Sequence, residues 1–291
     1  MGFKHIYEHQ YKKLLIIPFL IVILAIVQIA VQYSVTGDFV NKGISLKGGS
    51  SITLDHTIDV NAVESFLQQQ FPRADINIRT LSSAGKVVGV AIDSDAQESE
   101  EIDALISALK TKGIIQGDNY SLEVIGSSLG NSFFKQIITS LLIAFVLMGI
   151  VVFIYFRTVA PSLAVILAAF SDIMVTLAIF NMTGIKLSSA GIAAFLMLIG
   201  YSVDTDILLS SRMLKNKENS IMERVYSAMT TGLTMTGTTL LVVLIAFIFA
   251  QSDVVKQIML ILLIGLMVDL VMTWIQNVGI LRLFLEKKKN N

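Results

Sequence analysis

Four aspartates interrupt long apolar stretches of this 291-residue chain: Asp172, Asp204, Asp206 and Asp269. A charged side chain at the centre of a membrane helix costs roughly 2.5–3.5 kcal/mol on insertion scales. Serine or alanine would fill the same space without that cost, so packing alone does not account for these acids. We therefore expect them to form a relay for a coupling ion, H⁺ or Na⁺, as intramembrane acids commonly do. For Asp269, a hydrogen-bonded structural role is the alternative.

The depth of three of these acids suggests a shared layer. Counting ~1.5 Å of rise per residue from the expected cytoplasmic helix ends places Asp172 about 16 Å, Asp204 about 12 Å and Asp269 about 20 Å into the membrane. Carboxylates at one depth can share a proton or a water molecule away from bulk solvent. We therefore predict that Asp204 takes up and releases the ion, with Asp172 facing it from the preceding helix.

Asp204 and Asp206 must point in different directions, because residues two apart on a helix are rotated by about 200°. We predict that Asp204 faces the interior of a helix bundle, together with Gly200. Asp206 is shallower and is expected to face a partner subunit or cytoplasmic water. Arg212 ends the same apolar stretch, and we expect a snorkelling or positive-inside residue there, with a place in the relay as the alternative.

The stretch "TTGLTMTGTT" carries hydroxyl groups at helical spacing, on Thr230, Thr234 and Thr238. Small and hydroxyl-bearing residues commonly line the contacts between membrane helices. We predict that this face packs against the helix that carries Asp204. It would serve there either as a plain helix contact or as part of the ion pathway.

The composition is that of an integral membrane protein. The chain is 54% hydrophobic and 15% charged, and its mean hydropathy is +0.73, above what soluble domains carry. The formal net charge of zero gives no pull toward nucleic acid, there is no cysteine, and the three histidines lie apart from any carboxylate cluster. We therefore expect no nucleic-acid partner, no metal and no cofactor.

Apolar stretches near the roughly 20 residues that a membrane helix needs predict six transmembrane helices. The first stretch is too long for a signal-peptide core. Residues 1–13 and 284–291 are left as terminal tails, and the last five helices fill 133–283. The predicted helices cover 14–33, 134–156, 161–180, 188–211, 232–250 and 257–283.

Lysine and arginine residues predict the orientation of these helices. They gather in the two tails and in the 211–231 loop, whereas the short loops on the opposite side hold only Lys186 and Lys256. Both termini should therefore be cytoplasmic in a multi-pass protein of the cell membrane. The polar segment 34–132 should then face outward.

The outward segment predicts a small domain at about 50–126. The stretches "SITLDH", "ADINIRT", "KVVGVAI" and "YSLEVIG" are typical of strands. The stretches "DVNAVESFLQQQF" and "ESEEIDALISALKTKG" have helical spacing, and Asp59 is a candidate N-cap of the first. The order β-α-β-β-α-β is that of a ferredoxin-like α+β domain. The predicted fold class is thus membrane α-helical, with this extracytoplasmic domain between helices 1 and 2.

Three motifs resemble those of the SecF family of protein-export membrane subunits, within the resistance-nodulation-division superfamily. "IGYSVDTDILLSSR", with Gly200, Tyr201 and Ser202, resembles the fourth-helix signature of the family. "AAFSDIMVTLAIF" is similar to its third-helix motif and places Asp172 on the aspartate of the family. The six-helix topology with a large loop after the first helix is also similar.

The third motif is "GISLKGGSSITL", which carries Gly43, Lys47, Gly48 and Gly49 and resembles the Gly-Gly motif that follows the first helix in this family. A tight turn from the membrane into the first strand needs a positive φ or a close approach of backbones. We predict that Gly48 and Gly49 meet that need. The alternative is a flexible linker.

Several positions depart from the bacterial pattern of the family. Ser45 and Thr205 stand where an aspartate is usual, and Ser171 replaces a histidine. Thr231 or one of its neighbours lies where an arginine is common. These differences indicate the archaeal type of the family.

The resemblance implies an accessory subunit of the Sec translocon rather than an enzyme. Its partners would be a SecD-like subunit, the translocon channel, unfolded exported preproteins and membrane lipid. It would use the proton-motive force to assist export. The alternatives are a half-transporter that moves a lipid or small apolar molecule, and a membrane receptor or scaffold.

Overall fold

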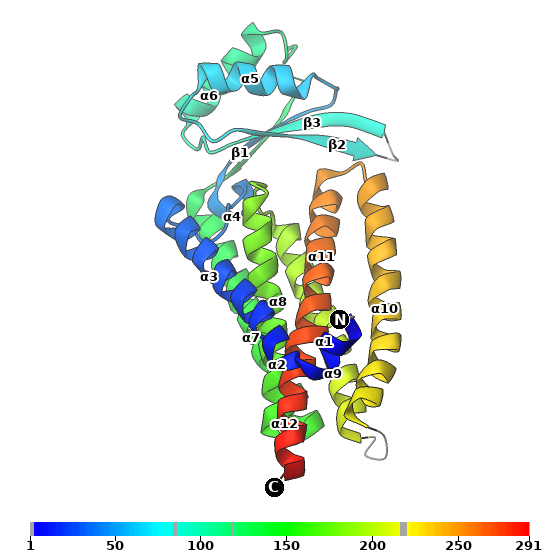
Figure 1. The fold of residues 1–291 in the computed structure, drawn as a ribbon. Helices are drawn as coiled ribbons and strands as arrows, with labels where there is room; N and C mark the ends of the chain where they lie inside the picture. The colour runs from blue at the N-terminus through cyan, green and yellow to red at the C-terminus, as the bar shows by residue number, and fades with distance from the viewer. Residues whose placement is uncertain (1–2, 84–85, 118, 216–219, 291) are drawn as a thin grey trace.

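The computed structural model describes residues 3–83, 86–117, 119–215 and 220–290. Within these residues, six helical stretches are long and apolar enough to cross a membrane, which confirms the predicted number. They form one bundle with a small α/β domain at one end (Figure 1). The bundle helices are α3 (Ile16–Thr36), α7 (Ser127–Phe156), α8 (Val159–Met182), α9 (Ser189–Lys215), α10 (Ile221–Phe249) and α11 (Asp253–Val271), the last continuing through the π-helix η1 (Met272–Asn277) into α12 (Val278–Asn290).

Three helices form the centre of this bundle. Helices α8, α9 and α11 bury about half of their most apolar residues within the chain, whereas α3, α7 and α10 bury fewer than a fifth. The central contact is close: a Cβ added to Gly265 of α11 would lie 2.5 Å from the side chain of Leu198 of α9. The peripheral helices therefore leave broad apolar surface for lipid or for another chain.

The fifth membrane helix begins earlier than predicted. Helix α10 starts at Ile221 rather than 232, because Ser220 and Glu223 form a capping box at its first turn. The Glu223 N–H donates to the Ser220 hydroxyl at 3.3 Å, and the Ser220 N–H donates to the Glu223 carboxylate at 3.0 Å. Most of the expected 211–231 loop is thus helical, and the remainder at 216–219 lies outside the described residues.

The outer domain has the predicted order of strands and helices. Its four strands form an antiparallel sheet in the order β2-β3-β1-β4, which is the ferredoxin-like topology. Asp59 caps the first helix by accepting from the Ala62 N–H at 3.2 Å, as expected. Part of the turn between the second and third strands, 84–85, lies outside the described residues. The elements are β1 (Gly49–Leu54), α5 (Val60–Gln70), β2 (Asn77–Ser83), β3 (Lys86–Ser94), α6 (Ser99–Thr111) and β4 (Ser121–Ile125).

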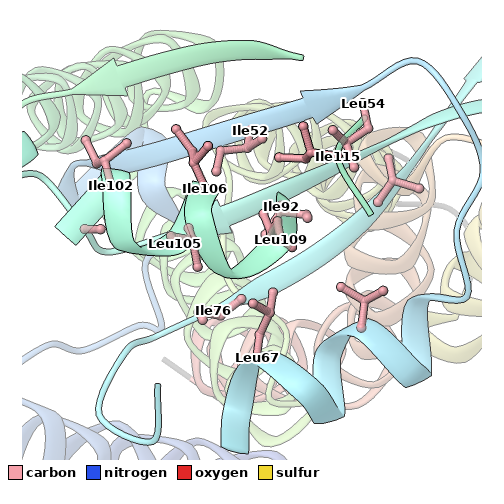
Figure 2. Packing of buried hydrophobic residues seen from close by; sticks show 13 residues of the cluster. Ile52, Leu54, Leu67, Ile76, Ile92, Ile102, Leu105, Ile106, Leu109 and Ile115 are labelled. Atoms are coloured by element: carbon pink, nitrogen blue, oxygen red, sulfur yellow. The ribbon is translucent and has the colours of Figure 1, made fainter. Parts of the chain in front are cut away.

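The domain has its own hydrophobic core. Figure 2 shows Ile52 of β1 and Ile92 of β3 facing Leu109 of α6 and Leu67 of α5, and all four side chains are fully buried. Both helices cover the face of the sheet that points away from the membrane helices, and the opposite face is turned toward them (Figure 1). The sheet is therefore the layer that meets the bundle.

Ion pairs fix the domain on the bundle. Asp75, between α5 and β2, accepts from Lys47 of the short helix α4 (Ile44–Lys47) and from Lys186 of the α8–α9 loop. Burial acts to raise the pKa of Asp75, but the hydrogen bonds from Lys186 and Lys47 outweigh it and hold the pKa below its ordinary value. A second contact between the domain and the bundle lies at α11. Thr80 of β2 donates its backbone N–H to Asp253, the first residue of that helix, at 2.9 Å.

The N-terminal residues 3–13 are largely helical instead of forming a free tail. Helices α1 (Phe3–His9) and α2 (Tyr11–Leu14) lie against the last membrane helix (Figure 1). The Tyr7 hydroxyl donates to the Trp274 carbonyl at 2.7 Å, and Arg282 donates to the Tyr7 carbonyl at 3.0 Å. These contacts fasten the N-terminal helices to η1 and α12, partway along the bundle (Figure 1).

Candidate functional site

Three of the four intramembrane aspartates meet in the centre of the bundle. Asp172 comes from α8, Asp206 from α9 and Asp269 from α11, and each side chain is fully buried. These are the three central helices, so the acids are enclosed by the chain itself. We call Asp172, Asp206 and Asp269 the carboxyl cluster.

Hydroxyl and amide groups hold the carboxyl cluster. Ser202, one turn before Asp206 on α9, donates to Oδ2 of Asp172. The hydroxyl of Thr273 lies 2.9 Å from Oδ1 of Asp206 and 3.0 Å from Oδ1 of Asp269, and so bridges α9 and α11. Asn277 adds a hydrogen bond from Nδ2 to Oδ1 of Asp206 at 2.7 Å.

Among the described residues, the carboxyl cluster has no cationic partner. In the part of the chain that the structure describes, no salt bridge involves any of its members. The second oxygen of each carboxyl group, Oδ1 of Asp172 and Oδ2 of Asp206 and Asp269, receives no hydrogen bond from a hydroxyl, amide or cationic donor among those residues. The carboxyl groups of Asp172 and Asp269 lie within hydrogen-bonding reach of each other. An unpaired buried charge is very costly. The chemistry suited to this group is therefore that of carboxyl groups that hold and exchange protons.

Two of the residues that hold the carboxyl cluster come from an irregular turn that helical periodicity does not predict. The π-helix η1 begins three residues after Asp269, and its residues Thr273, Gln276 and Asn277 are all fully buried. The wider π turn often appears at functional sites. Gln276 donates from Nε2 to the Ser171 hydroxyl at 3.0 Å, so η1 also contacts α8. The available signal was the run of polar residues four, seven and eight positions after Asp269 in an otherwise apolar span.

The prediction that Asp204 faces the interior is wrong. Asp204 is exposed on the outer face of α9, as are Gly200 and Tyr201, whereas Asp206 and Ser202 are buried. Asp204 and Asp206 lie on different faces of α9, as predicted, but the inward face is the one that carries Asp206. The polar residues of η1 lie beside Asp206, and they decide which acid is inside.

Arg212 does not reach the carboxyl cluster. Its Nη1 donates to the backbone carbonyl and to the hydroxyl of Ser227, both at 2.8 Å. It therefore ties the end of α9 to the first turns of α10. This contact agrees with the expected place at a helix end.

The threonine face of α10 does not pack against α9, contrary to the prediction. Thr230, Thr234 and Thr238 are exposed, and each hydroxyl donates to the carbonyl four residues earlier. The inward face of α10 instead carries Gly232, where an added Cβ would lie 2.4 Å from the ring of Trp274. Within this chain, both the Asp204 face and the threonine face are open.

The Gly-Gly motif has the predicted backbone geometry. Gly48 and Gly49 have φ values of 91° and 144°. An added Cβ would lie 2.6 Å from the Ser127 backbone at Gly48 and 2.2 Å from the Ser94 carbonyl at Gly49. Gly43, at the start of the motif, donates its N–H to the Leu187 carbonyl at 2.9 Å. The motif is therefore a rigid crossing of backbones and not a flexible linker.

Comparison with known proteins gives a consistent set of relatives. The profile of the family described as protein export membrane protein SecD/SecF, C-terminal, matches residues 105–287. The protein-export membrane protein SecF of Pyrococcus furiosus is 37% identical, covering 98% of this chain and 95% of that protein. The SecF of Methanothermobacter thermautotrophicus is 36% identical, and the match covers 95% of this chain and 93% of that protein. The SecF of Methanocaldococcus jannaschii is also 36% identical, and the match covers 94% of this chain and 96% of that protein. These relatives are archaeal, as the sequence indicates.

A solved structure shares the fold. The crystal structure of SecDF, a translocon-associated membrane protein from Thermus thermophilus, superposes with a TM-score of 0.71 at 19% identity. The match covers 97% of this chain but only 38% of that chain. A second structure, of SecDF in a super-membrane-facing form, gives a TM-score of 0.62 and covers 39% of that chain. The fold of this chain thus matches one part of the longer SecDF polypeptide.

Proposed function

This chain belongs to the SecD/SecF family of protein-export membrane proteins, and we propose that it is an accessory subunit of the Sec export machinery in the cell membrane. Its relatives carry the name protein-export membrane protein SecF, and the likeness to them spans nearly the whole chain. In this role it assists the translocation of unfolded preproteins and is not an enzyme. Both termini would be cytoplasmic, with the ferredoxin-like domain outside.

A SecD-like subunit is the partner that this proposal requires. The chain spans about 38% of the SecDF chain that it resembles, and superfamily bundles consist of two related six-helix halves. The exposed Asp204 supports this, because an acid that faces lipid is costly. A second bundle laid over Asp204 and the threonine face would remove that cost. The other contacts would be with the Sec translocon channel, exported preproteins and membrane lipid.

The carboxyl cluster is the observation that carries the energetic part of the proposal, the use of the proton-motive force. Its three acids have neither a cation nor a full set of hydrogen-bond donors among the described residues. Moving one charge through the membrane potential provides roughly 2.3 kcal/mol per 100 mV. That is comparable with the difference between two packings of one bundle. Uptake and release of a proton here would therefore shift the bundle between two packings.

Contacts at the outer helix ends connect such a shift to the domain. Helix α9 follows the loop that carries Lys186, which binds Asp75 of the domain. Helix α11 begins at Asp253, which accepts from both the backbone N–H and the hydroxyl of Thr80, at 2.9 and 3.2 Å. A change in the spacing of α9 and α11 at the carboxyl cluster would thus move two supports of the domain relative to one another.

Reconstitution tests this function. Proteoliposomes would contain the translocon, a SecD-like subunit and this chain, with a preprotein trapped partway across. We expect an imposed proton gradient to speed completion of export only when both accessory subunits are present. A protonophore should abolish the gain, and a sodium ionophore should not. Equal export with and without the gradient in the complete system would contradict the proposal.

A further inference from the structure

Two fully buried hydroxyl groups in the described part of the bundle have no hydrogen-bond partner. A serine or threonine in a helix usually bonds back to the carbonyl one turn earlier, as Ser162, Ser171 and Thr205 do here. The hydroxyls of Thr176 on α8 and Ser210 on α9 make no such bond and have no partner among the described residues. Both side chains are fully buried. An unpartnered buried hydroxyl calls for a partner of another kind.

These two residues flank the carboxyl cluster along the bundle. Thr176 lies four residues beyond Asp172, about 6 Å toward the outer domain. Ser210 lies four residues beyond Asp206, about 6 Å toward the opposite end. Helices α8 and α9 run in opposite directions (Figure 1), so the two hydroxyls lie on opposite sides of the cluster.

Further unpartnered atoms lie between these two hydroxyls. No donor among the described residues reaches the second oxygens of Asp172, Asp206 and Asp269, or Oδ1 of Asn277, whose Nδ2 is held by Asp206. Asp172 and Asp269 also contact each other through their carboxyl groups. Buried polar atoms without a protein partner are the places where proteins hold ordered water, typically with about three hydrogen bonds to each molecule. The donors and acceptors of such a chain of water are therefore present from one side of the cluster to the other.

We propose that Thr176 and Ser210 hold ordered water on the two sides of the carboxyl cluster, and that protons reach and leave the cluster along this water. The route then runs inside the bundle of this single chain, and not along the open face that carries Asp204. The inference rests on the proposed function and names its proton path. In each transfer, a carboxyl O–H bond breaks as an O–H bond of water forms, and that water passes a different proton onward.

One further titratable side chain approaches the cluster among the described residues: the Tyr7 hydroxyl of α1 donates to the Trp274 carbonyl, next to Thr273. Burial raises the pKa of Tyr7, so it stays protonated near neutral pH. Asp172, Asp206 and Asp269 are the ionisable groups that α8, α9 and α11 turn inward. The π-helix η1 adds only Thr273, Gln276 and Asn277, which are polar but do not titrate near neutral pH. Helix α3 packs here through Ala25, and α10 through Gly232. The buried Arg282 of α12 is directed at the backbone of Tyr7 and Glu8.

Hydrogen–deuterium exchange of the carboxyl cluster tests the route. The full chain would be placed in lipid nanodiscs, and infrared spectroscopy would follow the C=O band of protonated carboxyl groups after transfer to D₂O. Loss of intensity in the Asp206→Asn and Asp269→Asn variants would assign the band. We expect the double variant Thr176→Val/Ser210→Ala to slow exchange by about tenfold, and each single variant to slow it less, since one side stays open. Thr139→Val removes an exposed hydroxyl of α7 that bonds back to the Lys135 carbonyl, and it should exchange like the wild type.

Two results would overturn the inference. One is wild-type exchange in the double variant, and the other is the absence of any protonated-carboxyl band that the aspartate variants diminish. The Thr→Val and Ser→Ala changes are nearly isosteric, and an unchanged thermal unfolding temperature would exclude misfolding as the cause of slow exchange. Failure here is separable from failure of the proposed function. If the double variant exchanges normally while export still depends on the gradient, the proton path lies elsewhere and the export role stands.

Discussion

Asp206 of α9 and Asp269 of α11 share a single hydroxyl group, that of Thr273, at 2.9 and 3.0 Å. A hydroxyl has one hydrogen to donate and can accept another. If both acids were ionised, one of them would face the Thr273 oxygen without a hydrogen between them. If one acid keeps its proton, it donates to Thr273, which donates to the other. The geometry is therefore that of two acids that share one proton across two helices.

Thr273→Val should disrupt this arrangement without changing the shape of the side chain. Two carboxyl oxygens would lose their bridging partner, and an unsatisfied buried group costs ~1–3 kcal/mol. We expect a lower unfolding temperature in nanodiscs and weaker dependence of export on the gradient. Thr273→Ser keeps the hydroxyl and should restore most of both. Wild-type values for the valine variant in both measurements would show that the bridge has no role.

Gly49→Ala should destabilise the junction between the bundle and the domain. Its Cβ would lie 2.2 Å from the Ser94 carbonyl, and its φ of 144° disfavours any side chain. Gly126→Ala is the matched control, because Gly126 has a φ of −62° and open space around the added Cβ. We expect the unfolding temperature to fall for the first variant and to stay near the wild type for the second. Equal values for both variants would favour a flexible linker.

The docking of the domain should weaken in acid through Asp75. A carboxyl group whose folded pKa lies below its unfolded value of 3.8 stabilises the fold above that value, and the contribution is lost as the pH falls through the folded pKa. We therefore expect constant amide protection between about pH 5 and 8, and a loss of protection below about pH 4.

The reporter for this change is the N–H of Leu187, which donates to the Asn41 carbonyl at 2.6 Å beside Lys186. Asp75→Asn should lower the protection factor of the Leu187 N–H at neutral pH. The corresponding free energy of opening should fall by less than ~1 kcal/mol, since the ion pair is partly exposed. The variant should also remove the acid-dependent step. An acid step that persists in Asp75→Asn would assign it to another group.

The predictable parts of this fold have local causes. Strand alternation and helix spacing define the β-α-β-β-α-β order, and the hydrophobic length defines each membrane helix. The Gly48–Gly49 geometry follows from a turn that only glycine enters easily. The early start of α10 was also readable, since Ser220 and Glu223 stand at capping-box spacing.

The inward face of α9 could not be predicted by the same rules. Asp204 and Asp206 both lie on polar faces, and a 3.6-residue period does not say which face meets other helices of the chain. The answer depends on Thr273 and Asn277, which a π turn brings to the side of Asp206. A hydrogen bond from i to i+5 breaks the period on which sequence reasoning relies.

The central claim, that the buried Asp206 and not the exposed Asp204 takes part in the coupling, is tested by comparing two variants of one helix. Asp204→Asn and Asp206→Asn would each be reconstituted with the translocon and a SecD-like subunit, and the gradient-dependent rate of preprotein export would be measured. We expect Asp206→Asn to assemble normally and to lose most of the gradient-dependent rate, while Asp204→Asn retains most of it. Full gradient dependence in Asp206→Asn, together with its loss in Asp204→Asn, would contradict the account.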